Sequence, residues 1–196
     1  MCGAIDVSGA KLVEINMSDN AFGPIGLEAL MEFFQAGCCH SLRELRLHNN
    51  GLGPQGAQKL AHSLEQGWRK SGEKMALKVF VCGRNRLEYE GCKAVSNTLK
   101  LIGTLEEIQM PQNGIRPNAI EFIADACASN PNLRTINMND NTFRSVGSEW
   151  MAKALSKCTN LQYINFGDCL LKSRGALVLA RALVLSPDIK VCDLRF

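Results

Sequence analysis

One pattern of apolar and polar residues recurs along the chain. It consists of a leucine, two residues, an apolar residue, one residue, another apolar residue, two residues and then asparagine, as in Leu42, Leu45, Leu47 and Asn50. Alternation through the middle of the pattern predicts a short β-strand whose apolar side chains face a core. Copies of the pattern end, in order, at Asn20, Asn50, Asn85, Asn113, Asn141 and Cys169. A further copy begins near residue 189.

A helix is predicted between successive strands. After most strands come an apolar residue, a glycine and then apolar residues at helical spacing, as at Met151, Ala154 and Leu155. One strand and one helix in a unit of about 28 residues is typical of the long leucine-rich repeat. Because a single repeat cannot cover its own apolar face, neighbouring repeats must stack. The sequence therefore predicts an α/β solenoid of about six repeats over residues 1–196, with parallel strands on the concave face and helices outside.

Two departures from the period lead to further expectations. The spacing between Asn50 and Asn85 is 35 residues, and we expect the polar, glycine-containing stretch 66–75 to form a longer loop. That loop is either a solvated insertion without a role or a place where Trp68 caps the helix stack. The strand pattern also runs close to both ends of the sequence. We therefore expect an excerpt or shortened member of a longer array, whose end faces could promote self-association.

Composition narrows the class of protein. The chain of 196 residues is 46% hydrophobic and 21% charged, which suits one folded domain, and its net charge of +3 gives no basic footprint for direct nucleic-acid binding. Nine cysteines without Cys-x-x-Cys spacing predict reduced thiols in a cytosolic or nuclear protein, with no zinc site or other metal. We also expect no secretory signal, no membrane span and no cofactor.

Within each repeat, the last asparagine or cysteine is expected to serve the fold. Its side chain turns inward, where a small hydrogen-bonding group can satisfy the backbone groups left free as the chain leaves the strand. The residue just before it should point outward along the rim of the solenoid. That rim slot holds a polar residue in each of the six copies, in order Asp19, Asn49, Arg84, Gln112, Asp140 and Asp168. Arg86 is a second outward cation beside Asn85.

Two interpretations of this rim stay open. A strip that is basic at Arg84 and Arg86 and acidic at Asp140 and Asp168 is a plausible docking surface for another protein. Loops on a solenoid are also polar simply because they meet water, and polar loops need no function.

Catalytic chemistry within the chain is not expected. The three histidines, His40, His48 and His62, occupy unlike positions, and no serine or cysteine stands in a nucleophile-elbow context. The glycines at 51 and 53 lack the lysine of a phosphate-binding loop. Cys82 is close to Arg84, which would favour a lowered thiol pKa, but its strand position favours buried packing instead.

The segments between strands resemble a known family more specifically than the repeat count does. They are residues 18–24, 47–54, 82–88, 111–115, 140–143 and 167–170. Together, and in this order, they closely resemble the Ran GTPase-activating proteins.

The resemblance implies a regulator of an enzyme rather than an enzyme. It implies binding to the GTP form of a Ran-type small GTPase and stimulation of GTP hydrolysis without an arginine finger. In that family an asparagine positions the GTPase's own catalytic glutamine, and the match places this asparagine at Asn49. The same match makes Arg84, Arg86 and Asp140 contacts to the GTPase. His48, Gln112 and Asp168 are further rim candidates.

The resemblance also implies a role in nucleocytoplasmic transport and a cytoplasmic location, with the nuclear envelope as a second site. The alternative is a non-catalytic scaffold of the same fold, similar to ribonuclease-inhibitor-type repeats, that docks another protein without stimulating turnover.

Overall fold

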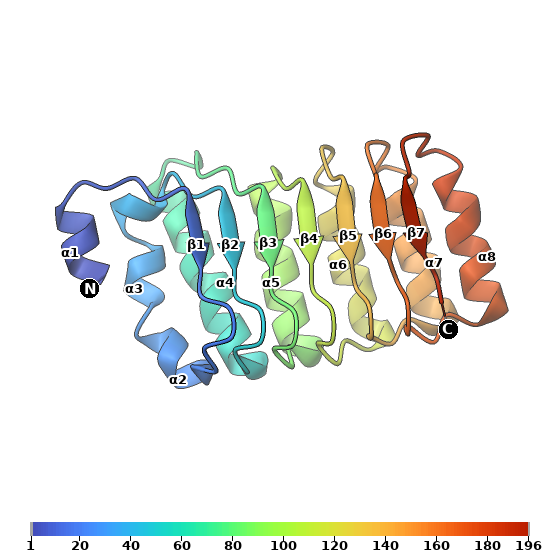
Figure 1. Cartoon of the computed structure of the whole chain (residues 1–196), viewed down its shortest axis with the longest axis horizontal. Coiled ribbons are helices and arrows are strands. Elements are labelled where there is room, and N and C mark those ends of the chain that lie inside the picture. The colour runs from blue at the N-terminus through green and yellow to red at the C-terminus, as the bar shows by residue number, and fades with distance from the viewer. Residues whose placement is uncertain (1, 196) are drawn as a thin grey trace.

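Seven short parallel strands form one sheet whose spatial order follows the sequence (Figure 1). The computed structural model describes residues 2–195. The strands are β1 (Glu14–Asn16), β2 (Glu44–Arg46), β3 (Val79–Val81), β4 (Glu107–Gln109), β5 (Thr135–Asn137), β6 (Tyr163–Asn165) and β7 (Val191–Asp193). Equivalent positions of successive repeats pair across the whole sheet, so that Ile15 lies beside Leu45 and Leu45 beside Phe80.

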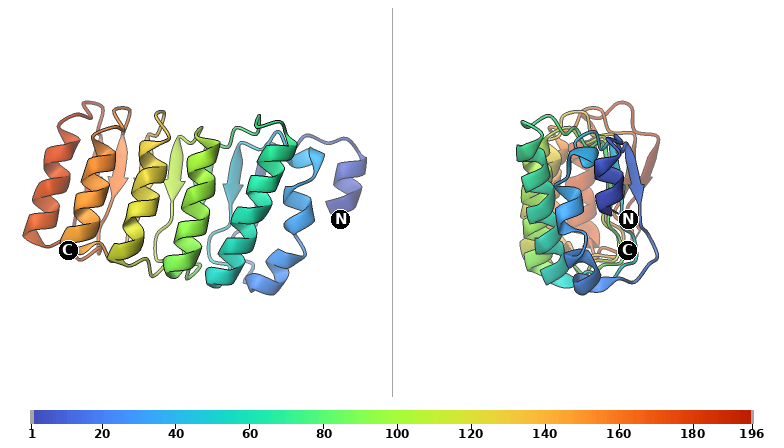
Figure 2. Two further views of the ribbon diagram at one scale, coloured as in Figure 1. Left: turned by 180° about the vertical axis from the view of Figure 1, so that it is seen from behind. Right: turned by 90° about the vertical axis from the view of Figure 1, so that its left-hand side faces the viewer.

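Helices form a second layer on one face of this sheet, as seen from behind in Figure 2. They are α1 (Cys2–Val7), α2 (Gly23–Glu28), α3 (Met31–Phe34), α4 (Gly53–Lys70), α5 (Glu88–Ile102), α6 (Ile120–Ala128), α7 (Arg144–Leu155) and α8 (Lys172–Leu183), with short 3-10 turns η1 (Gly37–Cys39) and η2 (Pro117–Ala119). Paired strands lie about 4.8 Å apart, whereas packed helices lie about 8–10 Å apart. The strand row is accordingly shorter than the helix row in Figure 1, which places the strands on the concave side. The predicted leucine-rich repeat solenoid is confirmed.

The core lies between the two layers. The middle residue of each strand from β2 to β6 is fully buried, for example Leu45 and Phe80. The corresponding residue of β7, Cys192, is exposed, because no helix follows β7 within residues 2–195. Apolar burial at the repeating positions is the main stabilising force of this layer.

A ladder of asparagine side chains runs through the solenoid beside the core. Asn113 is fully buried, and its Oδ1 accepts the backbone N–H of Asn85 at 2.9 Å. Its Nδ2 donates to the carbonyl oxygens of Cys82 and Met110, at 2.8 and 3.1 Å. One side chain thus satisfies backbone groups of two repeats that water cannot reach. Four of the predicted inward asparagines, Asn50, Asn85, Asn113 and Asn141, are buried in this way.

Asn20 departs from that prediction because it is exposed. Its Nδ2 still donates to the carbonyls of Met17 and Ser18, each at 2.9 Å. Within residues 2–195 no strand lies beyond β1, so nothing covers this end of the ladder. Cys169 continues the ladder at the other end, where its thiol donates to the carbonyl of Met138 at 3.1 Å.

The expected loop at 66–75 is wrong at its start. Helix α4 continues through Lys70, and the connection to β3 begins only at Ser71. Gly67 is buried in this helix, and a side chain there would overlap the carbonyl oxygen of Phe34. Trp68 packs partly buried against the core. The extra residues of this repeat therefore lengthen a helix as well as a loop.

Two further helical details differ from the expectation. The first repeat has two short helices, α2 and α3, in place of one. Helix α1 precedes the first strand and was not predicted. Its Asp6 Oδ1 accepts the backbone N–H of Cys38 at 3.1 Å.

Apolar side chains are exposed on the last unit, including Val184 at 80%.

Replacing Asn113 by alanine should lower the free energy of unfolding by about 3 kcal/mol, because buried backbone groups of two repeats lose their partner. The exposed end of the ladder supplies a matched control: Asn20→Ala should cost less than about 1 kcal/mol. Urea unfolding followed by circular dichroism measures both values. Equal costs at the two positions would contradict the burial argument.

Candidate functional site

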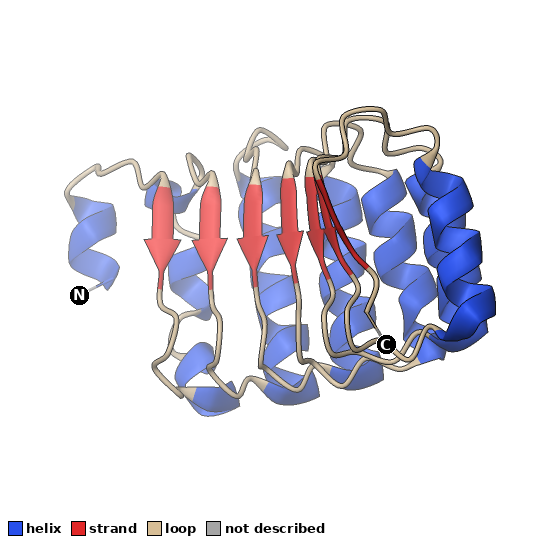
Figure 3. Ribbon diagram, turned by 45° about the vertical axis from the view of Figure 1, so that its right-hand side comes forward, coloured by secondary structure: helices blue, strands red, loops and turns tan. Residues whose placement is uncertain are grey.

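The six rim residues share an unusual backbone conformation. All lie on the loops that leave the carboxyl ends of the strands, along one edge of the solenoid (Figure 3). Each has a positive φ, namely Asp19 62°, Asn49 55°, Arg84 54°, Gln112 53°, Asp140 53° and Asp168 56°. A residue other than glycine adopts this left-handed region at a cost, and asparagine and aspartate tolerate it best.

Backbone hydrogen bonds between repeats hold this conformation. The N–H of Asn49 donates to the carbonyl of Gly83 at 2.8 Å, and the N–H of Arg84 donates to the carbonyl of Pro111 at 2.9 Å. The following residue then sends its side chain into the ladder, while the rim side chain points away from the core. Asn50 is 0% exposed, whereas Asn49 is only partly buried. The predicted inward and outward assignment of this pair is confirmed.

His48 lies beside Asn49 on the concave side. A Cβ atom added to Gly83 would lie 2.7 Å from His48 Nδ1 and 2.8 Å from Pro111 Cγ. The imidazole therefore rests over the backbone of the next repeat, and only glycine leaves room for it. His48 is partly buried and helps to fix the segment that carries Asn49.

Hydrogen bonds link rim side chains of adjacent repeats. Asn49 Nδ2 donates to Asp19 Oδ1 at 2.9 Å, and Gln112 Nε2 donates to Asp140 Oδ2 at 3.0 Å. In each pair a neutral amide meets a carboxylate, which makes the hydrogen bond charge-assisted. The pairs form between the rim slots of neighbouring repeats, so the repeat spacing itself brings these groups together.

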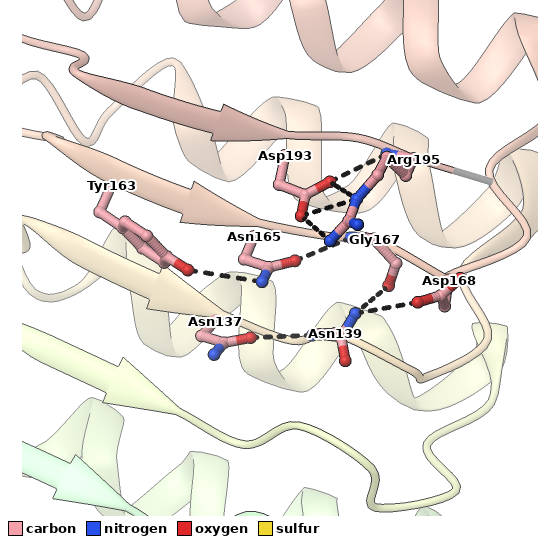
Figure 4. A network of polar contacts seen from close by, with 8 residues as sticks. All are labelled: Asn137, Asn139, Tyr163, Asn165, Gly167, Asp168, Asp193 and Arg195. Carbon is pink, nitrogen blue, oxygen red and sulfur yellow. Dashed lines mark hydrogen bonds and ion pairs between the residues drawn. The ribbon is translucent and has the colours of Figure 1, made fainter.

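A similar network is formed at the carboxyl-terminal end of the rim (Figure 4). Asn165 Oδ1 accepts the N–H of Gly167 at 3.0 Å, and Asn137 Oδ1 accepts the N–H of Asn139 at 3.1 Å. Asn139 Nδ2 donates to the carbonyl of Gly167 at 2.9 Å and to Asp168 Oδ2 at 3.3 Å. Asparagine at the end of a strand thus turns the chain onto the rim by binding its own backbone two residues on.

Two arginines lie between these paired ends, and neither has a partner among the described residues. Arg84 and Arg86 are exposed, and neither forms an ion pair or side-chain hydrogen bond with any residue in 2–195. Arg86 also has a positive φ, 53°. Two guanidiniums with all donors available suit a carboxylate or phosphate on a partner. The predicted contacts Arg84, Arg86, Gln112, Asp140 and Asp168 all lie on the loops that follow the strands, and His48 lies beside Asn49 on the concave side.

Another arginine on the concave face is held in place. Arg46 forms an ion pair with Glu44 at 2.8 Å, and the carboxylates of Glu14 and Glu107 each lie 3.9 Å away. Three carboxylates from three strands surround one guanidinium on the sheet surface. This arginine is therefore engaged within the sheet, unlike Arg84.

The sequence analysis did not identify a second set of basic residues near the rim. The residues three positions after the last three ladder residues are exposed cations, namely Arg116, Arg144 and Lys172. Two of them, Arg144 and Lys172, line an open hollow with Leu170 and Ser173 at the start of helix α8. The sequence could have revealed these cations if the residue three positions after each ladder residue had been compared between repeats.

Cys82 and Cys92 are fully buried and serve as packing residues. Burial raises the pKa of Cys82 to about 12, so the thiol stays protonated at neutral pH despite the nearby Arg84. Burial likewise raises the pKa of Cys92 to about 12.

Among the residues described, no group of three or more histidine, cysteine or acidic side chains is placed to hold a metal ion. None of the helices described there is both long and apolar enough to span a membrane.

The left-handed rim backbone reverses the usual preference for alanine over glycine. We expect Gln112→Gly to be more stable than Gln112→Ala by about 1 kcal/mol, because glycine adopts positive φ without a steric cost. At Asn97, an exposed position in helix α5, alanine should be more stable than glycine by about 1 kcal/mol. Urea unfolding of the four variants measures both differences, and the same order at both positions would be contrary evidence.

Comparison with known proteins agrees with this architecture. A family model described as "Leucine Rich repeat" matches residues 10–31 and 38–61. A solved structure titled "Crystal structure of TLR13-ssRNA13 complex" covers 80% of this chain and 22% of its own, at 19% identity and a TM-score of 0.46, which is too weak a likeness to add to the assignment.

Curated relatives are more informative. Ran GTPase-activating protein 1 of Xenopus laevis is 48% identical over 115 residues, which covers 57% of this chain and 20% of the relative. Ran GTPase-activating protein of Drosophila melanogaster is 41% identical over 134 residues, covering 67% and 22%. Ran GTPase-activating protein 2 of Caenorhabditis elegans is 47% identical over 115 residues, covering 58% and 12%. The matched part thus spans less than a quarter of each relative. These relatives and the repeat architecture identify the chain as a leucine-rich repeat protein homologous to the Ran GTPase-activating proteins.

Proposed function

We propose that this chain binds the GTP form of a Ran-type small GTPase and stimulates GTP hydrolysis through Asn49. The observation that carries the proposal is a neutral amide held outward at the rim, beside a buried ladder asparagine, in a chain whose relatives are named Ran GTPase-activating proteins. The chain acts as an enzyme regulator, with a role in nucleocytoplasmic transport. Its proposed location is the cytoplasm, with the nuclear envelope as a second site.

Positioning is the proposed mechanism. GTP hydrolysis requires a glutamine of the GTPase to orient the attacking water. An amide can accept a hydrogen bond from that glutamine and donate one to it, and it adds no charge. Orienting reacting groups can lower a barrier by several kcal/mol, so a neutral side chain is chemically sufficient. The backbone of Asn49 is already fixed by its hydrogen bond to Gly83, which reduces the rearrangement needed when the partner docks.

Binding is assigned to the charged rim. Arg84 and Arg86 have guanidiniums without a partner within residues 2–195 and are suited to acidic groups on the GTPase, while Asp140 and Asp168 are suited to basic ones. Such exposed charges mainly raise the association rate and select the partner. His48 and Gln112 complete the proposed contact strip. An arginine finger from Arg84 is the competing mechanism, because this side chain is both exposed and unpaired within residues 2–195.

The second candidate function is a scaffold that docks a protein without accelerating turnover. The observation in its favour is that the rim already forms a continuous polar strip, and a docking strip requires no catalytic group. Self-association through the apolar side chains exposed on the last unit, such as Val184, remains a separate proposal.

Single-turnover hydrolysis by GTP-loaded Ran should separate these functions. We expect Asn49→Ala to reduce the maximal stimulated rate by about 100-fold, as expected when one group that orients reacting atoms is removed. Asn49→Gly should give the same loss, and it controls for the left-handed backbone, which glycine tolerates. Arg84→Ala and Arg86→Ala should instead raise the concentration needed for half-maximal stimulation.

The competing functions give different results. If Arg84→Ala lowers the maximal rate as much as Asn49→Ala does, the arginine is the finger and the asparagine mechanism is wrong. Binding of Ran without stimulation by the parent chain would support the scaffold. Asn97→Ala, on a helix away from the rim, should leave both quantities unchanged.

A further inference from the structure

The side-chain amide of Asn49 has a partner in the preceding repeat. Its Nδ2 donates to Asp19 Oδ1 at 2.9 Å, across 30 residues of sequence. Asp19 and Asn49 occupy the same rim slot of adjacent repeats and share the left-handed backbone, with φ of 62° and 55°. Both backbone N–H groups are bonded to the next repeat, that of Asp19 to the His48 carbonyl at 2.8 Å. The two side chains are therefore held side by side by the ladder below them.

The chemistry of this pair determines which way the amide faces. An ionised carboxylate only accepts hydrogen bonds, whereas an amide has one accepting oxygen and one donating nitrogen. The nitrogen of Asn49 must therefore face Asp19, because the opposite orientation would place two acceptors together. The oxygen of Asn49 then points away from Asp19, and no donor within residues 2–195 hydrogen-bonds to it. One N–H of the same amide also has no acceptor in the part of the chain that the structure describes.

We infer that Asp19 is a positioning residue, which orients Asn49 so that its carbonyl oxygen and its second N–H are presented to the partner. The inference rests on the proposed function of Asn49. The group that fits this arrangement is one that donates a hydrogen bond to the oxygen and accepts one from the nitrogen, and a carboxamide does both. This matches a glutamine side chain on the GTPase.

A purely structural role does not account for the pair. Asp19 is exposed and Asn49 is only partly buried, so water can satisfy either side chain if the other is removed. Hydrogen bonds at exposed sites contribute little to folding because protein–water bonds replace them. What the pair does change is the freedom of the amide to rotate.

Two variants of Asp19 separate orientation from mere presence of a side chain. Asp19→Gly removes the acceptor while tolerating the positive φ, and we expect it to reduce the maximal stimulated rate of GTP hydrolysis by roughly ten-fold. The concentration for half-maximal stimulation should change little. Asp19→Asn keeps an accepting oxygen and also tolerates this backbone, so it should restore most of the rate.

A double variant tests whether Asp19 acts through Asn49. In the Asn49→Ala background, Asp19→Gly should cause no additional loss, because there is no amide left to orient. A further loss in that background would show that Asp19 contacts the GTPase directly and would overturn the inference. If Asn49→Ala itself leaves stimulation intact, the proposed function fails. If only Asp19→Gly is without effect, the positioning role fails and the proposed function stands.

A measurement that needs no GTPase completes the test. The two side-chain NH₂ protons of Asn49 can be followed by NMR in the parent chain and in Asp19→Gly. We expect slow, ordered signals in the parent and in Asp19→Asn, and increased mobility of the amide in Asp19→Gly, with unchanged urea unfolding. Equal order of this amide in all three proteins would overturn the positioning role whatever the hydrolysis assay gives.

Discussion

The asparagine ladder is the interaction on which the rest of the structure depends. Strands of three residues pair too briefly to fix the path of the chain beyond their ends. Buried amides such as Asn113 take over there, because each binds backbone groups of its own repeat and of the one before. Since the buried groups would otherwise lack partners, each repeat is locked to its neighbours in one register. The spacing and orientation of the rim follow from that lock.

The conformation of the rim is a consequence of the same constraint. To send Asn50 inward, the chain places Asn49 in the left-handed region and turns its side chain outward. The same turn recurs in the six repeats from Asp19 to Asp168, so rim side chains recur at the spacing of the strands, and in two places they hydrogen-bond to their equivalents in the next repeat. The hydrogen bond between Asn49 and Asp19 exists because of this recurrence. A binding surface can therefore change in sequence at the rim while the fold beneath it stays the same.

The sequence was sufficient to predict the solenoid, the strand positions and the division between Asn49 and Asn50, because burial and alternation repeat in every copy. It was less informative where a single tertiary contact determines the length of a helix or the partner of a side chain. Helix α4 continues past Gly67 because that glycine accommodates the carbonyl of Phe34, and no periodicity reports such a contact. The side-chain partner of Asn49 depends on packing between repeats, which becomes visible only once the two rim slots are aligned in space.

The arginines of the rim and Asn49 are suited to different roles. Arg84 and Arg86 are unpaired within residues 2–195 and have long, flexible side chains that can adapt to a partner's acidic groups. These side chains lose conformational entropy when they bind. Asn49 has a short side chain, a fixed backbone and a bonded amide, so little freedom remains to be lost on docking. A group that must place another side chain accurately benefits from such preorganisation, whereas a group that attracts a partner does not require it. On this physical ground the amide suits the positioning role and the arginines suit recognition.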